Sequence, residues 1–590
     1  MAQPLLITEH RKQHTEPPTH HVLASSQSSW LPTSSIQLTD AENGDNAPIA
    51  FRNPWPSWHK PTLAEVWQGL EWGEDRDTSI DYAMQDVKLE SEASTIQQAQ
   101  YSDDPTHKSD ADPPTGTPTT TRVPAAQSSR AERCRQAAAQ LLQVEQPDFS
   151  FHPKSSSSSS LKATWLGHAG VLLQLAPLSP GSEPTRVLFD PIFSQRCSPS
   201  QLAGPIRSYQ APCPISALPP VDLVIISHNH YDHLDYETVR LLWENNADRL
   251  RFVVPLGNKA WFTGGDTSAP APASTLGLLQ MAPDSIVSSN LAIPDDRVIE
   301  LDWWDEISLT QTASGAAPQT DASQAPSSEA DHLRIICTPA QHGSGRYGVD
   351  ANRALWSSWF LKHTTASRTR HIFFGGDTGC QFHGPAFPPA PPIDALFDDT
   401  STDLADEDGH SDASRADDVR LNIATTTAPD DGETSPLSNG DAQADPFVYP
   451  ACPAFDEIVE RLGRPHFLML PVSVGATISF LRSYVPLPDS LSPFPRISTG
   501  LTAANHMPPW DAVSVFASMT DRSPEAVCMA IHWGTFISGP EEVLKTLGQL
   551  KWACNQQRVR YARSLDRHAS STDTTKPIFV ALNHGASIEP

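Results

Sequence analysis

Three features that mark other protein classes are missing from this sequence: long apolar runs, paired cysteines and an excess of positive charge. No stretch reaches the roughly 20 consecutive apolar residues that a membrane-spanning helix requires. The 8 cysteines are scattered and contain no Cys-x-x-Cys pair, which indicates a reducing compartment and no disulfide framework. The formal net charge of -28, with 41 Lys and Arg against 69 Asp and Glu, argues against nucleic acid as a partner.

The N-terminus also lacks the apolar segment of a secretory signal. Residues 1–30 are rich in His, Ser and Thr and carry few basic residues, which is atypical of an organellar presequence. We therefore expect an intracellular protein with neither a secretory signal nor a transmembrane helix.

Proline is abundant instead. It supplies 55 of the 590 residues, about twice the ordinary share, and it clusters with Ser, Thr, Asp and Gly. Such stretches cannot bury enough apolar surface to fold, so they predict disorder. The predicted organisation is a disordered N-terminus (1–48), an arm that packs on the core (49–72), a low-complexity linker (73–160) and a folded core domain (161–590) with inserts at about 263–295, 311–331, 381–450 and 483–504.

Two short segments before the core have more structure than their surroundings. Trp55 and Trp58 predict that the arm is pinned to the core, and the alternative is an aromatic anchor at an interface. Apolar spacing predicts a short amphipathic helix over residues 63–72 and a further helix over 130–144 within the linker.

Residues that bind metals are concentrated in one stretch. The apolar run 223–226 predicts a buried strand. It is followed by four ligand-type side chains within six residues: His228, His230, Asp232 and His233. Packing does not require this density, whereas zinc and other divalent transition metals bind imidazole and carboxylate. Alternation places the first two His on one side, and the following turn lets the other two residues face a second metal. Metals roughly 3.5–4 Å apart are a hydrolase arrangement.

Three later apolar strands also end in ligand-type residues, which are His342, Asp377 and His532. Strands that end on the same edge of a sheet system bring their last residues together. These side chains and the first cluster suffice for two metals with a bridging carboxylate. We interpret His168, a single His at a glycine turn, as structural, and Asp190, at another strand end, as a brace behind the ligands.

At this point the sequence resembles a known family. The H-x-H-x-D-H motif followed by His, Asp and His is similar to the metallo-β-lactamase fold superfamily, and the closer resemblance is to N-acylphosphatidylethanolamine-hydrolysing phospholipase D. The segments that carry it are Asn53–Trp58, Thr164–Ala169, Asp190–Ser194, Ser198–Gln201, Ile226–Tyr236, Ile299–Trp304, Gly376–Gly379, Cys452–Phe455 and Ala530–Phe536. The resemblance implies an α/β (α+β) fold, a four-layer αββα sandwich with long disordered inserts.

The resemblance also implies a ligand set and an activity. One Zn²⁺ would be held by His228, His230 and His342, the second by Asp232, His233 and His532, and Asp377 would bridge them. The implied reaction converts N-acylphosphatidylethanolamine to N-acylethanolamine and phosphatidic acid. The implied partners are a phospholipid substrate, a membrane surface and a second copy of the chain. The expected location is the cytoplasmic side of a membrane or an organelle such as the mitochondrion.

In the expected mechanism, two metals lower the pKa of a shared water, and the resulting hydroxide attacks phosphorus. Asp232 and Asp377 position the metals, Asp377 also holds the released proton, and His506 or a water protonates the leaving group. Two alternatives stay open. One is another hydrolase of the same fold, such as a lactonase, a thioesterase or a different phosphodiesterase. The other is a non-catalytic lipid-binding or scaffold protein.

Overall fold

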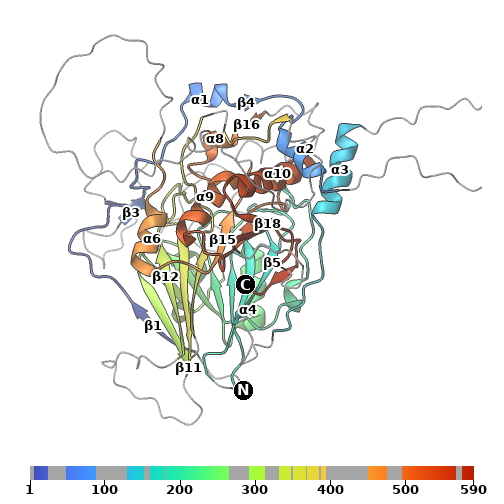
Figure 1. Ribbon diagram of the computed structural model, residues 1–590. Helices are drawn as coiled ribbons and strands as arrows, with labels where there is room; N and C mark the ends of the chain where they lie inside the picture. The colour runs from blue at the N-terminus through green and yellow to red at the C-terminus, as the bar shows by residue number, and fades with distance from the viewer. Residues whose placement is uncertain are drawn as a thin grey trace, which may run out of the picture.

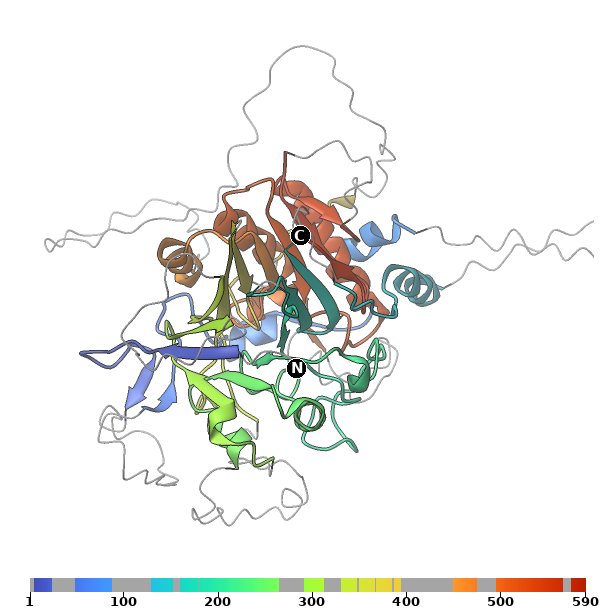
Figure 2. The same ribbon diagram turned by 90° about the horizontal axis from the view of Figure 1, so that it is seen from below.

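Two β-sheets pack face to face, and helices cover their outer faces (Figures 1 and 2). The computed structural model describes residues 5–23, 48–87, 129–151, 160–179, 181–264, 291–311, 331–346, 350–366, 368–384, 387–393, 449–474, 495–565 and 575–590. The four layers are the predicted αββα sandwich, so the predicted fold class is confirmed.

The larger sheet has nine strands. In spatial order they are β1 (Leu5–His10), β11 (Glu306–Gln311), β12 (His332–Thr338), β13 (Ser358–Thr365), β14 (Arg368–Phe374), β15 (Phe467–Pro471), β17 (Val527–Ile531), β19 (Ile578–Val580) and β18 (Arg560–Ala562). Pairing is antiparallel from β1 to β14 and parallel from β14 to β18. As a result, β12, β14, β15 and β17 all run in the same direction through this sheet.

The second sheet has seven strands. In spatial order they are β10 (Val298–Leu301), β9 (Arg251–Pro255), β8 (Leu223–Ile225), β7 (Thr185–Phe189), β6 (Gly170–Leu175), β5 (Leu161–Gly167) and β20 (Ser587–Ile588). The first four are parallel and the rest antiparallel. Two small ribbons pair β2 (His21–Leu23) with β3 (Pro48–Phe51) and β16 (Arg496–Ile497) with β4 (Leu70–Glu71).

Helices cover each sheet on its outer face (Figure 2). On the side of the nine-stranded sheet lie α6 (Ala454–Leu462), α9 (Pro509–Thr520) and α10 (Pro540–Gln556), with α2 (Thr78–Met84) and α3 (Arg130–Leu141) packed on α10. On the other side lie α4 (Tyr236–Asn246) and α5 (Lys259–Thr263). The remaining helices are α1 (Leu63–Gln68), α8 (Thr499–Thr502) and the 3₁₀ turns η2 (Ile215–Ala217) and η4 (Asp295–Arg297).

The continuous apolar run of β8 is explained by burial on both faces. Leu223 and Ile225 belong to the core between the sheets, whereas Val224 and Ile226 pack beneath α4. A strand covered on both sides must be apolar at every position, so the usual alternation disappears. Helix α4 buries Val239 on the same core with helical spacing.

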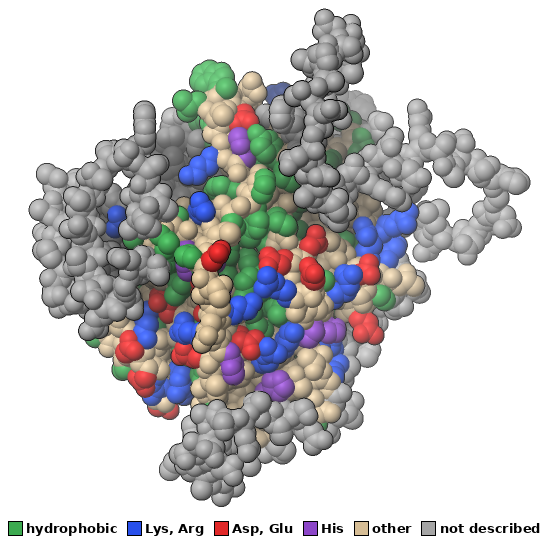
Figure 3. Space-filling view, turned by 90° about the vertical axis from the view of Figure 1, so that its left-hand side faces the viewer, with side chains coloured by type: hydrophobic (Ala, Val, Ile, Leu, Met, Phe, Trp, Pro, Cys, Tyr) green, Lys and Arg blue, Asp and Glu red, His purple; other side chains and the backbone are tan. Residues whose placement is uncertain are grey.

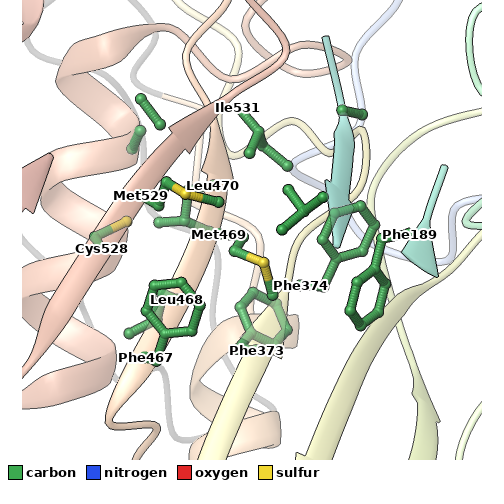
Figure 4. Close-up of a cluster of buried hydrophobic side chains, with 14 of the residues drawn as sticks. Phe189, Phe373, Phe374, Phe467, Leu468, Met469, Leu470, Cys528, Met529 and Ile531 are labelled. Atoms are coloured by element: carbon green, nitrogen blue, oxygen red, sulfur yellow. The ribbon is translucent and has the colours of Figure 1, made fainter. Parts of the chain in front are cut away.

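Aromatic side chains from the two sheets meet in the central core. The rings of Phe189 on β7 and Phe374 on β14 stack with centroids 4.5 Å apart (Figure 4). On the other face, α10 lies so close to α2 that a Cβ at Gly548 would be 1.9 Å from the carbonyl oxygen of Ser79. Only glycine permits this approach of two backbones.

Several sequence-based boundaries were wrong. Residues 5–23, predicted to be disordered, form β1 and part of the β2–β3 ribbon, because β1 pairs along its full length with β11. Within the predicted linker, α2 packs on α10, and the predicted loop 483–504 contains β16 and α8 near its end. Strands β11 and β13 were not predicted. Most of the predicted inserts, at 265–290, 312–330, 394–448 and 475–494, lie outside the described residues.

The core predicts a large difference between two leucine truncations. Leu468 on β15 is fully buried, whereas Leu202 is 93% exposed. We expect Leu468→Ala to lower the free energy of unfolding by about 2–5 kcal/mol and Leu202→Ala by less than about 0.5 kcal/mol. Urea denaturation followed by tryptophan fluorescence measures both. Equal effects of the two substitutions would contradict the packing described.

Candidate metal centre

The structure brings all seven predicted ligands to one edge of the sandwich. They follow the carboxyl ends of four strands: His228, His230, Asp232 and His233 follow β8, and His342, Asp377 and His532 follow β12, β14 and β17. Four of them are buried, and three, which are His230, Asp232 and His532, are partly buried. The edge is shared because β8 in one sheet and the other three strands in the facing sheet end side by side. Gly376 permits this closeness: its φ is +57°, and a Cβ there would lie 2.6 Å from Ser227.

Three imidazole nitrogens form one half of the site. His228 Nε2 lies 2.8 Å from His230 Nδ1, and His342 Nε2 lies 3.2 and 3.3 Å from those two atoms. Nitrogen ligands about 2.0–2.1 Å from a tetrahedral metal are separated by roughly 3.3 Å. The three rings are therefore spaced as the ligands of one metal ion.

Hydrogen bonds on the far side of these rings fix where their protons lie. His342 Nδ1 donates to the carbonyl oxygen of Asn505 at 2.9 Å. The hydroxyl of Ser227 donates to Asp190, so it accepts from His228 Nδ1 at 2.9 Å. When both rings are neutral, the Nε2 atoms of His228 and His342 therefore carry no proton, and their lone pairs face one another. A cation between the two atoms would turn this repulsion into attraction.

The other half of the site mixes imidazole and carboxylate. His532 Nε2 lies 3.0 Å from Asp377 Oδ1 and 3.6 Å from Asp232 Oδ2. His233 Nε2 lies 3.3 Å from Asp377 Oδ2 and 3.7 Å from Asp232 Oδ2. Among the described residues, His233 Nε2, His532 Nε2 and Asp377 Oδ1 are buried without an aligned hydrogen-bond partner. Buried atoms without such partners, lying this close together, fit a second cation.

Asp377 connects the two halves. Its Oδ2 also lies 3.8 Å from His342 Nε2 in the three-imidazole half. Since its two oxygens face both groups of rings, this carboxylate is placed to contact two cations at once. The donor set as a whole fits two divalent metal ions.

The protonation of the two halves differs. Burial lowers the pKa of His228 and His342 well below the ordinary value and that of His230 to about 4. Burial also acts to lower the pKa of His532, but the charges of Asp377 and Asp232 raise it to about 9. Burial acts to raise the pKa of Asp377, and the adjacent His532 and His233 outweigh this and hold it well below its usual range. Three neutral rings thus face an ionised pair of carboxylates.

Asp190 stands behind the ligands, as the sequence predicted for a strand-end carboxylate. Its Oδ2 accepts from His233 Nδ1 at 2.8 Å and from the hydroxyl of Ser227 at 2.5 Å. The residue is fully buried and has a φ of +35°, a left-handed conformation that costs energy outside glycine. One carboxylate therefore orients ligands in both halves of the site.

His168 has a larger role than the sequence indicated. Its Nε2 lies 2.9 Å from Asp232 Oδ2, and its carbonyl oxygen accepts from the backbone N–H of His532 at 2.9 Å. Its φ is +50°. The ring is grouped with Asp232, His233 and His532 at distances that a metal ion could bridge. The glycine turn Gly167–Gly170 was the only local signal, and it did not distinguish this role from a structural one.

His506 and the N-terminal arm complete the surroundings. His506 Nε2 lies 3.3 Å from Asp377 Oδ2, and its side chain is partly exposed. Asn53 in the arm exchanges two hydrogen bonds with the backbone of His342, at 2.6 and 3.2 Å. Trp55 stacks on Trp303 with centroids 5.4 Å apart. The arm therefore reaches a ligand of the site directly.

The position of Asp190 yields a test. We expect Asp190→Asn to weaken metal binding by about 10–100-fold, the usual cost of losing a partner behind metal ligands. Asp222→Asn is the matched control, since Asp222 is also buried but precedes β8 at its opposite end, where it binds Arg249. Competition titration with a chromophoric chelator measures both affinities. A metal affinity of Asp190→Asn equal to that of the control would refute the bracing role.

Comparisons with known proteins agree with this geometry. Residues 185–428 match the model of the beta-lactamase superfamily domain. An uncharacterized protein of Mycobacterium tuberculosis is 34% identical over 222 residues, which cover 38% of this chain and 43% of that protein. The N-acyl-phosphatidylethanolamine-hydrolyzing phospholipase D 1 of Caenorhabditis elegans is 30% identical over 223 residues, 38% of this chain and 48% of that protein. The mitochondrial enzyme of the same name from Saccharomyces cerevisiae is 30% identical over 194 residues, 33% and 31% of the two chains.

The aligned regions thus span less than half the length of these curated relatives. Among solved structures, a diiron β-hydroxylase from Streptomyces venezuelae aligns with a TM-score of 0.32 at 13% identity, covering 74% of this chain and 55% of that one. A metallo-β-lactamase fold protein from Bacillus subtilis aligns with a TM-score of 0.29 at 10% identity, covering 73% and 100%. From the αββα layers, the ligands at the shared strand edge and the family match, we conclude that the chain contains a domain of the metallo-β-lactamase superfamily.

Proposed function

We propose that this chain is a zinc-dependent phosphodiesterase that hydrolyses N-acylphosphatidylethanolamine to N-acylethanolamine and phosphatidic acid. The observation that carries the proposal is the pair of adjoining ligand groups joined by Asp377. The curated relatives in worm and yeast, named for this hydrolysis, supply the substrate class. Imidazole and carboxylate ligands suit zinc, and they also suit iron and other divalent transition metals.

The residues of the site divide the chemistry between them. When bound, two divalent cations supply a water of lowered pKa and neutralise the charge of a phosphoryl group. Asp377 holds the two halves of the site at a fixed separation, and Asp190 and Ser227 hold the rings of His228 and His233. In the proposed reaction the oxygen of water forms a bond to phosphorus, and the bond between phosphorus and the ethanolamine oxygen breaks. In this proposal His506, which is partly exposed and lies 3.3 Å from Asp377, or a water gives that leaving oxygen a proton.

The substrate is a membrane lipid, so the protein must reach a bilayer. Within the described part of the chain, no helix is long and apolar enough to cross one. Leu63 and Trp67 on α1 and Trp72 beyond it are 90%, 76% and 64% exposed. Apolar side chains gather in the upper part of the face shown in Figure 3, level with α1 in Figure 1. We propose that α1 makes peripheral contact with the membrane.

Two further parts of the proposal concern assembly and location. A homodimer is expected from the family resemblance. A place on the cytoplasmic face of a membrane or in the mitochondrion is expected as well, and the yeast relative is named as mitochondrial.

An assay on vesicles tests the activity. We expect the full chain with zinc to release N-acylethanolamine from vesicles that contain N-acylphosphatidylethanolamine. Asp377→Asn should lose at least about 100-fold in rate, since even partners behind metal ligands are worth 10–100-fold. His332→Ala, at the far end of the strand that leads to His342, is the control and should keep full activity. Absence of product with wild-type protein, together with turnover of a lactone or thioester, would refute the proposed substrate.

The exposed α1 residues give a separate prediction. We expect Trp67→Ala to weaken binding to phospholipid vesicles by at least about tenfold, because burying on the order of 100 Å² of indole is worth about 2.5 kcal/mol. Trp67→Phe should restore most of the binding. Turnover of a water-soluble short-chain analogue should not change in either variant. Vesicle co-sedimentation measures the binding, and unchanged binding of Trp67→Ala would exclude α1 as the contact.

A further inference from the structure

A second group of metal-binding side chains lies outside the site described above. His20, His21 and Asp302 place ligand atoms within 4.8 Å of one another. His20 Nε2 lies 2.7 Å from Asp302 Oδ1, and His21 Nε2 lies 2.9 Å from Asp302 Oδ2. His20 and Asp302 are buried, and the side chain of His21 is 10% exposed. None of these residues belongs to the seven-ligand site.

The backbone turns both imidazoles toward one carboxylate. Adjacent residues of a strand point to opposite faces. Here His20 lies in the turn before β2 and His21 begins that strand, so their rings meet edge to face with centroids 4.5 Å apart. The ring of His20 is also fixed by stacking on Trp303 at 4.1 Å. Two imidazole nitrogens and a carboxylate oxygen held this close together are a donor set typical of a metal site.

Hydrogen bonding accounts for only one of the two rings. His20 Nε2 forms an aligned hydrogen bond with Asp302 Oδ1, which also accepts from the backbone N–H of Trp303 at 2.7 Å. His21 Nε2 is as close to the other oxygen, but it is not aligned as a hydrogen bond and is buried without such a partner among the described residues. A cation within the group would give this nitrogen a partner.

The charges of the group also favour a cation. Burial lowers the pKa of His20 despite the neighbouring carboxylate. Burial acts to raise the pKa of Asp302, but the adjacent imidazoles of His20 and His21 outweigh this and hold the pKa well below its usual range. Asp305, a second buried carboxylate, accepts from the backbone N–H of Asp302 at 3.2 Å. Arg11 lies 3.6 Å from Asp305 Oδ2 and is the charged partner of that carboxylate, and a divalent cation would be the matching partner of Asp302.

We propose that His20, His21 and Asp302 bind a third divalent cation, of the kind that two imidazoles and a carboxylate select, such as Zn²⁺. The cation is structural. It ties the described segment that ends in β2 to the turn after β10, and β2 pairs with β3, which leads into the arm. The carbonyl oxygen of His20 accepts from the backbone N–H of Arg52, next to Asn53, which holds the backbone of His342.

Metal counting on the full chain tests the proposal. Protein without an affinity tag is stripped of metal, loaded with Zn²⁺, passed over a chelating resin and analysed by plasma mass spectrometry. We expect three equivalents of zinc per wild-type chain and two for both His21→Ala and Asp302→Asn. His10→Ala is the matched control, because His10 is exposed at the end of β1, and it should keep three. Two equivalents in the wild type, or an unchanged count in both variants, would overturn the proposal.

A second variant keeps this test independent of the catalytic site. In a chain with His228→Ala and His532→Ala we expect one equivalent of zinc to remain, and adding His21→Ala should remove it. A count of zero in the double variant, with the far-ultraviolet circular dichroism of the wild type, would refute the third site. The outcome does not depend on whether the protein hydrolyses a phospholipid.

The structural role has its own readout. Trypsin cleavage after Arg11 and Lys12, which precede the histidines, should be faster in zinc-loaded His21→Ala than in zinc-loaded His10→Ala. Equal cleavage rates would show that the cation does not hold the segment.

Discussion

The buried carboxylate of Asp377 is the contact on which the rest of the site depends. It lies within 3.0 and 3.3 Å of His532 and His233 on one side and 3.8 Å from His342 on the other. An ionised group at this depth is costly unless cations face it from every direction. In the αββα fold, strands of both sheets end at one edge. Imidazoles from distant segments therefore surround this single carboxylate, and the cations that they would bind lie next to it.

The residues behind the ligands make the arrangement rigid. Asp190 serves the histidines of both halves, and the backbone carbonyl oxygen of Asn505 fixes His342. The N-terminal arm adds a third support through Asn53. These contacts orient lone pairs before a metal arrives, which lowers the cost of binding it. They also explain why left-handed backbone is tolerated at Asp190 and His168, where the surrounding structure determines the conformation.

The core, α1 and the N-terminal segment contribute different parts of the structure around the metal centre. The core supplies the ligands, and α1 exposes apolar side chains at the surface. His20 and His21, at the start of β2, contact Asp302 in the turn after β10, and β2 pairs with β3 ahead of the arm. A change far from the metal centre in sequence can therefore reach it through the arm, because Asn53 connects the two by direct hydrogen bonds.

The sequence by itself determined the features that are local. The apolar run before His228 and the spacing of the four ligands after it are readable within fifteen residues, and His342, Asp377 and His532 each follow an apolar strand. The fold class and the candidate ligands could therefore be predicted. The role of His168 could not, because its backbone is held by hydrogen bonds with His532 and Thr535, more than 360 residues away.

Only the tertiary structure decided the role of the N-terminal segment. The apolar run at the start of residues 5–23 is only three residues long, Leu5 to Ile7, and polar residues follow it, so it does not predict a strand. Strand β1 forms because β11 offers it an edge to pair with. Long-range pairing of this kind leaves no periodic signal in an exposed edge strand. Packing of distant segments also brings His342 Nε2 close to His228 Nε2. In the same way it brings His20 and His21 to the carboxylate of Asp302.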